Sequence, residues 1–149
     1  LDDMVAHLDI APKTFWDTID SYGEEWWASL EPEEWAYELL DLVKFYDRDF
    51  TVLTSPSRSH FAGSGKILWL QKFFNHKFSN YIITPAKNKK KLAHKKAILI
   101  DDNDKNCEEF RSRLGYTILF PRIWNINHDL ENEKIEYTKK HLMLISNFI

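Results

Sequence analysis

The chain has little cysteine, glycine and proline, and it has no long apolar run. One cysteine, Cys107, in 149 residues can neither cross-link the fold nor build a zinc cluster, which is typical of a reducing, cytoplasmic setting. Four glycines and five prolines are too few for a low-complexity linker protein. No apolar run approaches the roughly 18 residues that cross a bilayer, so we expect a cytoplasmic protein that has no membrane partner.

The chain does contain enough apolar residues for one domain, and its charge is unevenly distributed. With 44% hydrophobic and 29% charged residues, the disordered and fibrous classes are excluded. Residues 1–49 carry 14 acidic and 3 basic side chains, whereas residues 50–149 carry 9 acidic and 17 basic ones. Five of the six tryptophans lie before residue 70. The acidic, tryptophan-rich front segment therefore needs a role of its own.

The apolar spacing predicts helices that alternate with strands. Helices are expected over residues 12–23, from Pro32 through Val43, around residues 67–74, before a closing Gly115, and over residues 131–147. Short apolar runs at residues 50–54, 81–84, 97–100 and 116–120 end in turns and predict strands. This alternation predicts an α/β fold with a Rossmann-like parallel sheet covered on both faces. In such sheets ligands bind beyond the carboxyl ends of the strands.

The predicted strand ends carry polar side chains. Asp101 and Asp102 follow an apolar strand, and neighbouring carboxylates there either bind a divalent cation such as Mg2+ or cap the next helix through Asp102 or Asn103. Thr54 and Ser55 end another strand, where their hydroxyls either bind phosphate oxygens or satisfy the backbone of the turn.

A lysine run follows the strand at residues 81–84. Residues 86–96 hold six lysines, which form either an anion-binding surface or a solvated loop or helix face. One lysine near a phosphate would neutralise the charge that builds up during phosphoryl transfer.

Other candidate motifs do not support a site. Residues 63–66 (GSGK) do not make a phosphate-binding P-loop, because His60 replaces its first glycine and Ile67 follows the lysine. The six histidines show no metal-ligand spacing. Cys107 lies three residues into a predicted helix and is expected to be a small core residue.

Four ordered segments resemble the haloacid dehalogenase-like (HAD) phosphohydrolase superfamily: residues 1–6 (LDDMVA), residues 54–56 (TSP), a downstream lysine, and residues 98–102 (ILIDD). Residues 26–32 (WWASLEP), 65–70 (GKILWL), 99–103 (LIDDN) and 119–121 (LFP) further resemble the 5'(3')-deoxyribonucleotidase group and its phage and bacterial relatives. The resemblance covers about residues 1–125. It implies a HAD-type α/β core at residues 1–6 and 50–149, with a small helical cap at residues 7–49 inserted after the first motif.

The resemblance also implies a role for each matching residue. Asp2 fits the general acid/base of the first motif and would contact the metal through its carbonyl, which places the nucleophilic aspartate just before Leu1. Thr54 and Ser55 would hold the phosphoryl oxygens. Asp102 would ligate Mg2+, with Asp101 in its outer shell or as a second ligand. The third-motif lysine matches Lys87 and Lys89 equally well.

The cap would bind the base of a nucleotide. Trp26 and Trp27 either stack on a nucleobase or pack the core of the cap. An acidic cap disfavours long polyanions, so nucleic acid is not the expected substrate. The resemblance implies a Mg2+-dependent 5'-nucleotidase-like phosphatase that acts on nucleoside 5'-monophosphates, deoxyribonucleotides included, through an aspartyl-phosphate. Homodimers are common in the family.

Two other hypotheses stay open. The chain is a non-catalytic phosphate-binding or interaction module, or an inactive fragment, if the residue before Leu1 is not aspartate. A nucleic-acid binder that uses the lysine run would bind in a strongly salt-dependent way and would ignore Mg2+ chelation.

Overall fold

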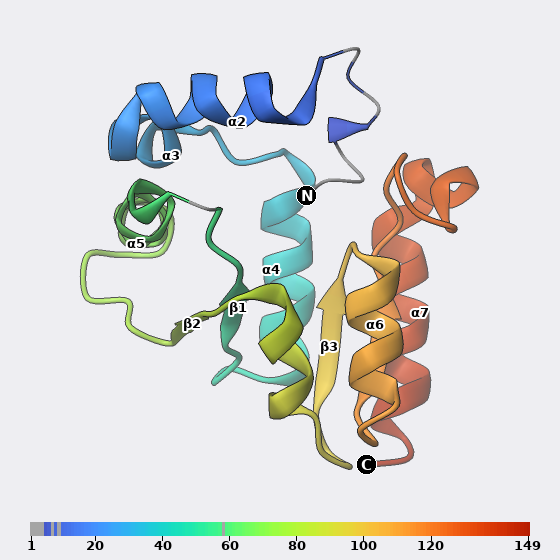
Figure 1. Ribbon diagram of the computed structural model, residues 1–149. Coiled ribbons are helices and arrows are strands. Elements are labelled where there is room, and N and C mark those ends of the chain that lie inside the picture. The colour runs from blue at the N-terminus through green and yellow to red at the C-terminus, as the bar shows by residue number, and fades with distance from the viewer. Residues whose placement is uncertain (1–4, 7, 9, 58) are drawn as a thin grey trace. The chain divides into compact units, whose positions relative to one another are not determined.

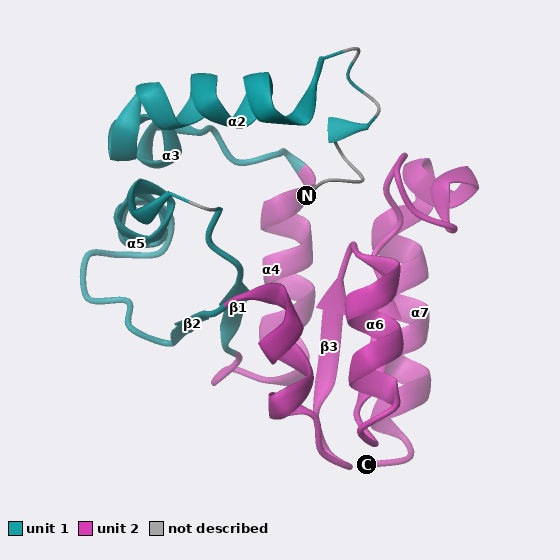
Figure 2. Cartoon of the chain, viewed as in Figure 1, with its two compact units in different colours: residues 1–34, 51–84 teal, residues 35–50, 85–149 magenta. Residues whose placement is uncertain are grey.

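The computed structural model describes residues 5–6, 8, 10–57 and 59–149, which form a mixed α/β structure of helices and short parallel strand pairs (Figure 1). The chain divides into two compact units (Figure 2). Unit 1 comprises residues 1–34 and 51–84, and unit 2 comprises residues 35–50 and 85–149. Within the described residues, no helix combines the length and apolarity needed to cross a membrane.

Unit 1 contains three helices and one pair of strands. These are α2 (Pro12–Ser21), α3 (Gly23–Ser29), β1 (Val52–Thr54), α5 (His60–Phe73) and β2 (Tyr81–Ile83). Strands β1 and β2 pair in parallel, with Leu53 opposite Ile82. A buried cluster joins Ile19 of α2, Trp27 of α3 and Ala62 of α5, and α5 also buries Leu70.

Helices α3 and α5 approach each other closely at Gly65. A Cβ atom on Gly65 would lie 2.5 Å from both the Glu24 carbonyl oxygen and the Trp27 Cβ. Only glycine fits this contact, because atoms of α3 already occupy the space that a side chain would need. The GSGK segment lies inside α5, which begins at His60 and not near residue 67 as expected.

Unit 2 contains the second strand pair, with α-helices and 3-10 helices around it. Its elements are α4 (Trp35–Tyr46), the 3-10 helix η1 (Ala86–Leu92), β3 (Ile98–Asp101), α6 (Asp104–Arg111), β4 (Tyr116–Leu119), the 3-10 helix η2 (His128–Glu133) and α7 (Lys134–Ser146). Strands β3 and β4 are parallel, and Asp101 lies opposite Leu119. The buried apolar side chains of this unit come from both strands, α6, α7 and the residue after β4: Leu99, Cys107, Phe110, Ile118, Leu119, Phe120 and Leu142.

The strand predictions are confirmed in place and direction, and the sheet is confirmed only as parallel pairs. All four expected apolar runs contain strands, and these pair as β1 with β2 and β3 with β4. Each strand has three or four residues, shorter than the runs that predict them. Within the described residues, β1 pairs with β2 and β3 pairs with β4 in two separate sheets.

The helix predictions fail mainly at the ends. Helix α2 begins at Pro12 as expected but ends at Ser21, and a further helix, α3, begins at Gly23. The expected terminator Gly23 has φ of 66°, so it turns the chain into α3 instead of ending the helical region. Helix α4 begins at Trp35 and not at Pro32.

The end of α6 also differs from expectation. The left-handed residue after α6 is Leu114, with φ of 67°, and not Gly115. Gly115 is required for another reason, because a Cβ there would lie 2.2 Å from the Phe110 ring. Packing against Phe110 therefore requires glycine at position 115, and Leu114 adopts the strained left-handed conformation.

The predicted cap of residues 7–49 spans elements of both units. Helices α2 and α3 belong to unit 1 together with β1, α5 and β2, whereas α4 belongs to unit 2. The division into a cap and a HAD-type core stays a prediction.

Candidate functional site

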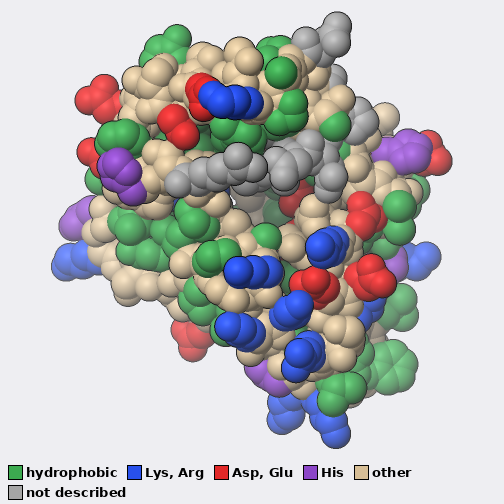
Figure 3. Space-filling view, in the orientation of Figure 1, with side chains coloured by type: hydrophobic (Ala, Val, Ile, Leu, Met, Phe, Trp, Pro, Cys, Tyr) green, Lys and Arg blue, Asp and Glu red, His purple; other side chains and the backbone are tan. Residues whose placement is uncertain are grey.

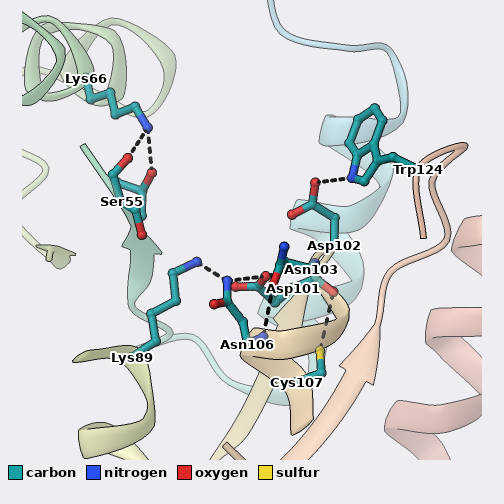
Figure 4. Close-up of polar contacts among 10 residues, drawn as sticks. Ser55, Lys66, Lys89, Asp101, Asp102, Asn103, Asn106, Cys107 and Trp124 are labelled. Atoms are coloured by element: carbon teal, nitrogen blue, oxygen red, sulfur yellow. Dashed lines mark hydrogen bonds and ion pairs between the residues drawn. The ribbon is translucent and has the colours of Figure 1, made fainter. Parts of the chain in front are cut away.

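The carboxyl end of β3 carries a buried ion pair. Asp101 and Lys89 are each 7% exposed, and Lys89 Nζ lies 2.6 Å from Asp101 Oδ2 (Figure 4). Asp101 Oδ1 accepts hydrogen bonds from the Asn103 backbone N–H (3.0 Å) and from Asn106 Nδ2 (2.9 Å). Three donors therefore occupy the two oxygens of this carboxylate.

Lys89 differs from the other lysines of the basic run. Of the six lysines in residues 86–96 it alone is buried, whereas Lys87 is exposed. Helix η1 turns Lys89 toward β3, and basic side chains gather on the visible face over η1 and α6 (Figure 3). This geometry favours Lys89 over Lys87 as the lysine that contacts the motif at the end of β3. The remaining lysines are exposed or only partly buried, as expected if the run is a solvated loop or helix face.

Asp102 presents a less crowded carboxylate. It is half-buried, and its Oδ2 accepts one hydrogen bond, from Trp124 Nε1 at 3.1 Å. Within the described part of the chain, the Asp102 carboxylate has no other hydrogen-bond partner. The helix-capping role falls to Asn103, whose side chain accepts from the Asn106 N–H. Asp102 therefore has a carboxylate oxygen left for another ligand.

The donor chemistry here fits Mg2+, which prefers carboxylate oxygens and retains waters. Asp102 has a carboxylate oxygen to offer, whereas Asp101 is already engaged by Lys89 and two amide donors. The arrangement thus favours Asp102 as the ligand and Asp101 as its outer-shell neighbour. Asp2, the other expected ligand, lies outside the described residues. Among the residues that are described, no three His, Cys, Asp or Glu side chains converge on a common point.

Cys107 supports this strand end from the core. It is 1% exposed, and its thiol contacts the Asp101 carbonyl oxygen at 3.6 Å. Burial, reinforced by the Asp101 charge, raises the pKa of the Cys107 thiol to about 12. The thiol is therefore un-ionised at neutral pH, and the expectation of a core cysteine is confirmed.

The carboxyl end of β1 brings two hydroxyls and a lysine together within unit 1. Lys66 Nζ, from α5, donates to Thr54 Oγ1 (3.1 Å) and to the Ser55 carbonyl oxygen (2.6 Å). The Ser55 hydroxyl is buried and has no hydrogen-bond partner within the described residues. A buried hydroxyl without a partner is costly, and a bound phosphate oxygen would satisfy it.

The two cap tryptophans occupy different environments. Trp27 is a core residue of unit 1, stacked on Trp16 with ring centroids 6.5 Å apart. Lys66 Nζ lies 5.1 Å from the centre of its ring. Trp26 is half-buried and meets Trp27 edge-on at 4.8 Å. The core interpretation therefore describes Trp27 well, and Trp26 has the more accessible ring for a base.

Sequence reasoning missed the residues that hold Asp102. Trp124 contacts its carboxylate, and buried Asn125 donates from Nδ2 to its carbonyl oxygen at 2.9 Å. Both residues follow Pro121, just beyond the carboxyl end of β4. The strand-end rule that singled out the other three strands would have found them if it had been applied to the fourth.

Three comparisons of the chain with known proteins give no match. No protein-family model matches the chain, and neither the curated proteins nor the solved structures contain a match. The family resemblance therefore rests on the sequence motifs, and the function is argued from the residues themselves.

Proposed function

We propose that this protein is a Mg2+-dependent phosphomonoesterase with a HAD-type core that hydrolyses nucleoside 5'-monophosphates, deoxyribonucleotides included. The observation that carries the proposal is the buried Lys89–Asp101 ion pair next to Asp102. A buried ion pair contributes little net stability, because desolvating the two charges offsets their attraction. Its position at the end of a parallel strand is where α/β proteins bind ligands.

Each unit contains candidate residues of its own. In unit 1, Thr54 and Ser55 would bind phosphoryl oxygens, and the buried hydroxyl of Ser55 supports this role. In unit 2, Lys89 would offset the negative charge that builds up on the transferring phosphoryl group. Asp101 holds the Lys89 ammonium, so the lysine is oriented before any ligand binds.

The proposed metal site uses Asp102, with Asp101 beside it. Mg2+ would bring the substrate phosphate and the protein carboxylates together and neutralise their charge. If an aspartate stands before Leu1, it would attack phosphorus and form an aspartyl-phosphate as the nucleoside oxygen departs. Asp2 protonates the departing alkoxide, and it later activates the water that hydrolyses the aspartyl-phosphate.

The distribution of charge supports a small substrate. Residues 1–49 carry 14 acidic and 3 basic side chains, and such a field repels long polyanions more strongly than it repels one monophosphate. Trp26, half-buried on α3, offers a ring that a nucleobase could stack on. A homodimer is the proposed assembly, by analogy with the family.

The test is phosphate release from a panel of nucleoside monophosphates. The chain would be prepared as printed and also extended by an aspartate placed before Leu1, and each would be assayed with Mg2+ or with chelator. We expect release from the extended chain with Mg2+ alone. Lys89→Met is expected to lower kcat at least about a hundredfold, the usual cost of removing a group that stabilises transition-state charge.

Matched variants separate the proposed site from general charge effects. Lys91→Met removes an exposed lysine two residues from Lys89, and Asp129→Asn neutralises a carboxylate whose side chain is 90% exposed. Both are expected to keep wild-type activity, whereas Asp102→Asn is expected to lose it. A folded, extended chain with aspartate before Leu1 that releases no phosphate would refute the proposal. Binding without hydrolysis would favour the non-catalytic phosphate-binding module.

A further inference from the structure

The loop after β4 holds the backbone of Asp102. Asn125 is 5% exposed, and its Nδ2 donates to the carbonyl oxygens of Asp102 (2.9 Å) and Phe120 (2.8 Å). Its Oδ1 accepts from the backbone N–H groups of Arg122 (3.3 Å) and Asn127 (3.0 Å). One buried amide side chain therefore ties this loop to the residue that follows β3.

The same loop also holds the Asp102 side chain. Trp124 Nε1 donates to Asp102 Oδ2 at 3.1 Å, and Figure 4 shows the indole N–H directed at this one oxygen. The Arg122 guanidinium lies 4.5 Å from the centre of the Trp124 ring and 5.3 Å from that of Trp35. Arg122 Nε in turn lies 3.5 Å from Glu131 Oε1. The indole is thus held by a cation that other residues of unit 2 anchor.

We infer that Trp124 is a positioning residue for Asp102: its indole N–H holds Oδ2 and thereby presents Oδ1 to a divalent cation. This inference rests on the proposed function, because it assigns the orientation of the proposed metal ligand. A carboxylate with one oxygen fixed loses less rotational freedom when the other binds a metal. Arg122 supports the orientation by stacking on the Trp124 ring.

The direct test is the affinity for Mg2+, measured by calorimetric titration of the extended chain. Trp124→Phe keeps an aromatic ring next to Arg122 and removes only the indole donor. Partners that orient a metal ligand typically contribute 10- to 100-fold to metal affinity, and we expect at least about a tenfold loss. Trp69→Phe is the matched control, since it removes an indole donor that bonds the Leu30 carbonyl oxygen, in unit 1.

Kinetics separate positioning from a general structural effect. If Trp124 acts through the metal ligand, Trp124→Phe raises the Mg2+ concentration needed for half-maximal rate. The rate at saturating Mg2+ stays close to that of the wild type. A variant that only loses packing would lower the rate at every Mg2+ concentration, and this result would overturn the inference.

A second measurement leaves Trp124 in place and needs no metal. The indole N–H resonance of Trp124 is assigned by triple-resonance NMR of the chain itself, without the Trp124→Phe variant. In Asp102→Ala it should shift and lose protection from solvent exchange, while the Trp69 resonance stays unchanged. An unchanged Trp124 resonance would overturn the inference even if Trp124→Phe did not fold.

The outcomes also distinguish this inference from the proposed function. If the wild-type chain neither binds Mg2+ nor releases phosphate, both fail together. If the wild type binds Mg2+ and Trp124→Phe binds it as tightly as Trp69→Phe does, the positioning role alone is refuted. If Trp124→Phe alone binds Mg2+ more weakly and its rate returns to the wild-type value at high Mg2+, the proposed function and the positioning role are both supported.

Discussion

Replacing Lys89 with methionine tests the central interaction of unit 2. Methionine keeps most of the length of the lysine side chain and removes its charge, so the Asp101 carboxylate loses one of three donors. The side chains of this ion pair are only 9% and 4% exposed. Water therefore cannot replace the lost ammonium without local opening of the structure.

The expected loss of stability follows from this burial. Removing one partner of a buried ion pair costs about 3–5 kcal/mol, because the remaining charge stays desolvated. Asp101 keeps the Asn103 and Asn106 donors, so we expect the lower end, about 3 kcal/mol. The free energy of unfolding of a domain of this size is about 5–15 kcal/mol, so this loss would be a large fraction of the total stability.

Urea denaturation measures this loss, with Lys90→Met as the matched control. Lys90 pairs with Glu109 at 3.2 Å, but those side chains are 32% and 27% exposed. Removing this more exposed pair should cost less than about 1 kcal/mol. The double variant Lys89→Met/Asp101→Asn should lose less stability than the sum of the losses in the two single variants, by about 0.5–3 kcal/mol. Equal costs for Lys89→Met and Lys90→Met would refute the reasoning.

Three further predictions concern the fold. Leu114 is 66% exposed with φ of 67°, so Leu114→Gly should raise the free energy of unfolding by up to about 1 kcal/mol by relieving left-handed strain; a decrease in urea denaturation would contradict this. Gly65→Ala should lower the free energy of unfolding by about 1–3 kcal/mol through overpacking against Glu24. Gly63→Ala is the control, because its Cβ would meet nothing within 4 Å, and it should raise the free energy of unfolding by about 0.5–1 kcal/mol. The pKa of the Cys107 thiol is raised from 9.0 to about 12, so between these pH values the folded state keeps a proton that the unfolded state loses, and this residue's contribution to stability should fall as pH rises from about 9 toward 12. Iodoacetamide at pH 9 should label Cys107 only when urea is added. Rapid labelling of the folded chain would contradict the assignment.

The local pattern of residues predicted most elements because neighbouring residues decide them. Pro12 marks the start of α2, and the apolar runs locate all four strands. Helix α3 was missed because its sequence, GEEWWAS, is too short to show a helical period. Its stability comes from packing against α5, which depends on Gly65, about forty residues away in sequence.

Local sequence predicted part of the candidate site, and burial in the folded chain decided the rest. Motif order singled out Asp101, Asp102, Thr54 and Ser55, and it left Lys87 and Lys89 equal. Burial separates the two lysines, because only Lys89 forms an ion pair with Asp101. A run of similar lysines contains no local signal for which one will be enclosed.

By itself, therefore, the sequence determined the class of elements, the places of the strands along the chain and the residue types at the strand ends. Each of these depends on periodicity or composition within a few residues. Tertiary structure alone decided how each carboxylate is bonded within the described residues: Asp101 pairs with Lys89, and Asp102 accepts from Trp124 through one oxygen. Such contacts join residues 12 and 22 positions apart, and chain folding sets them through burial and geometry that no local pattern records.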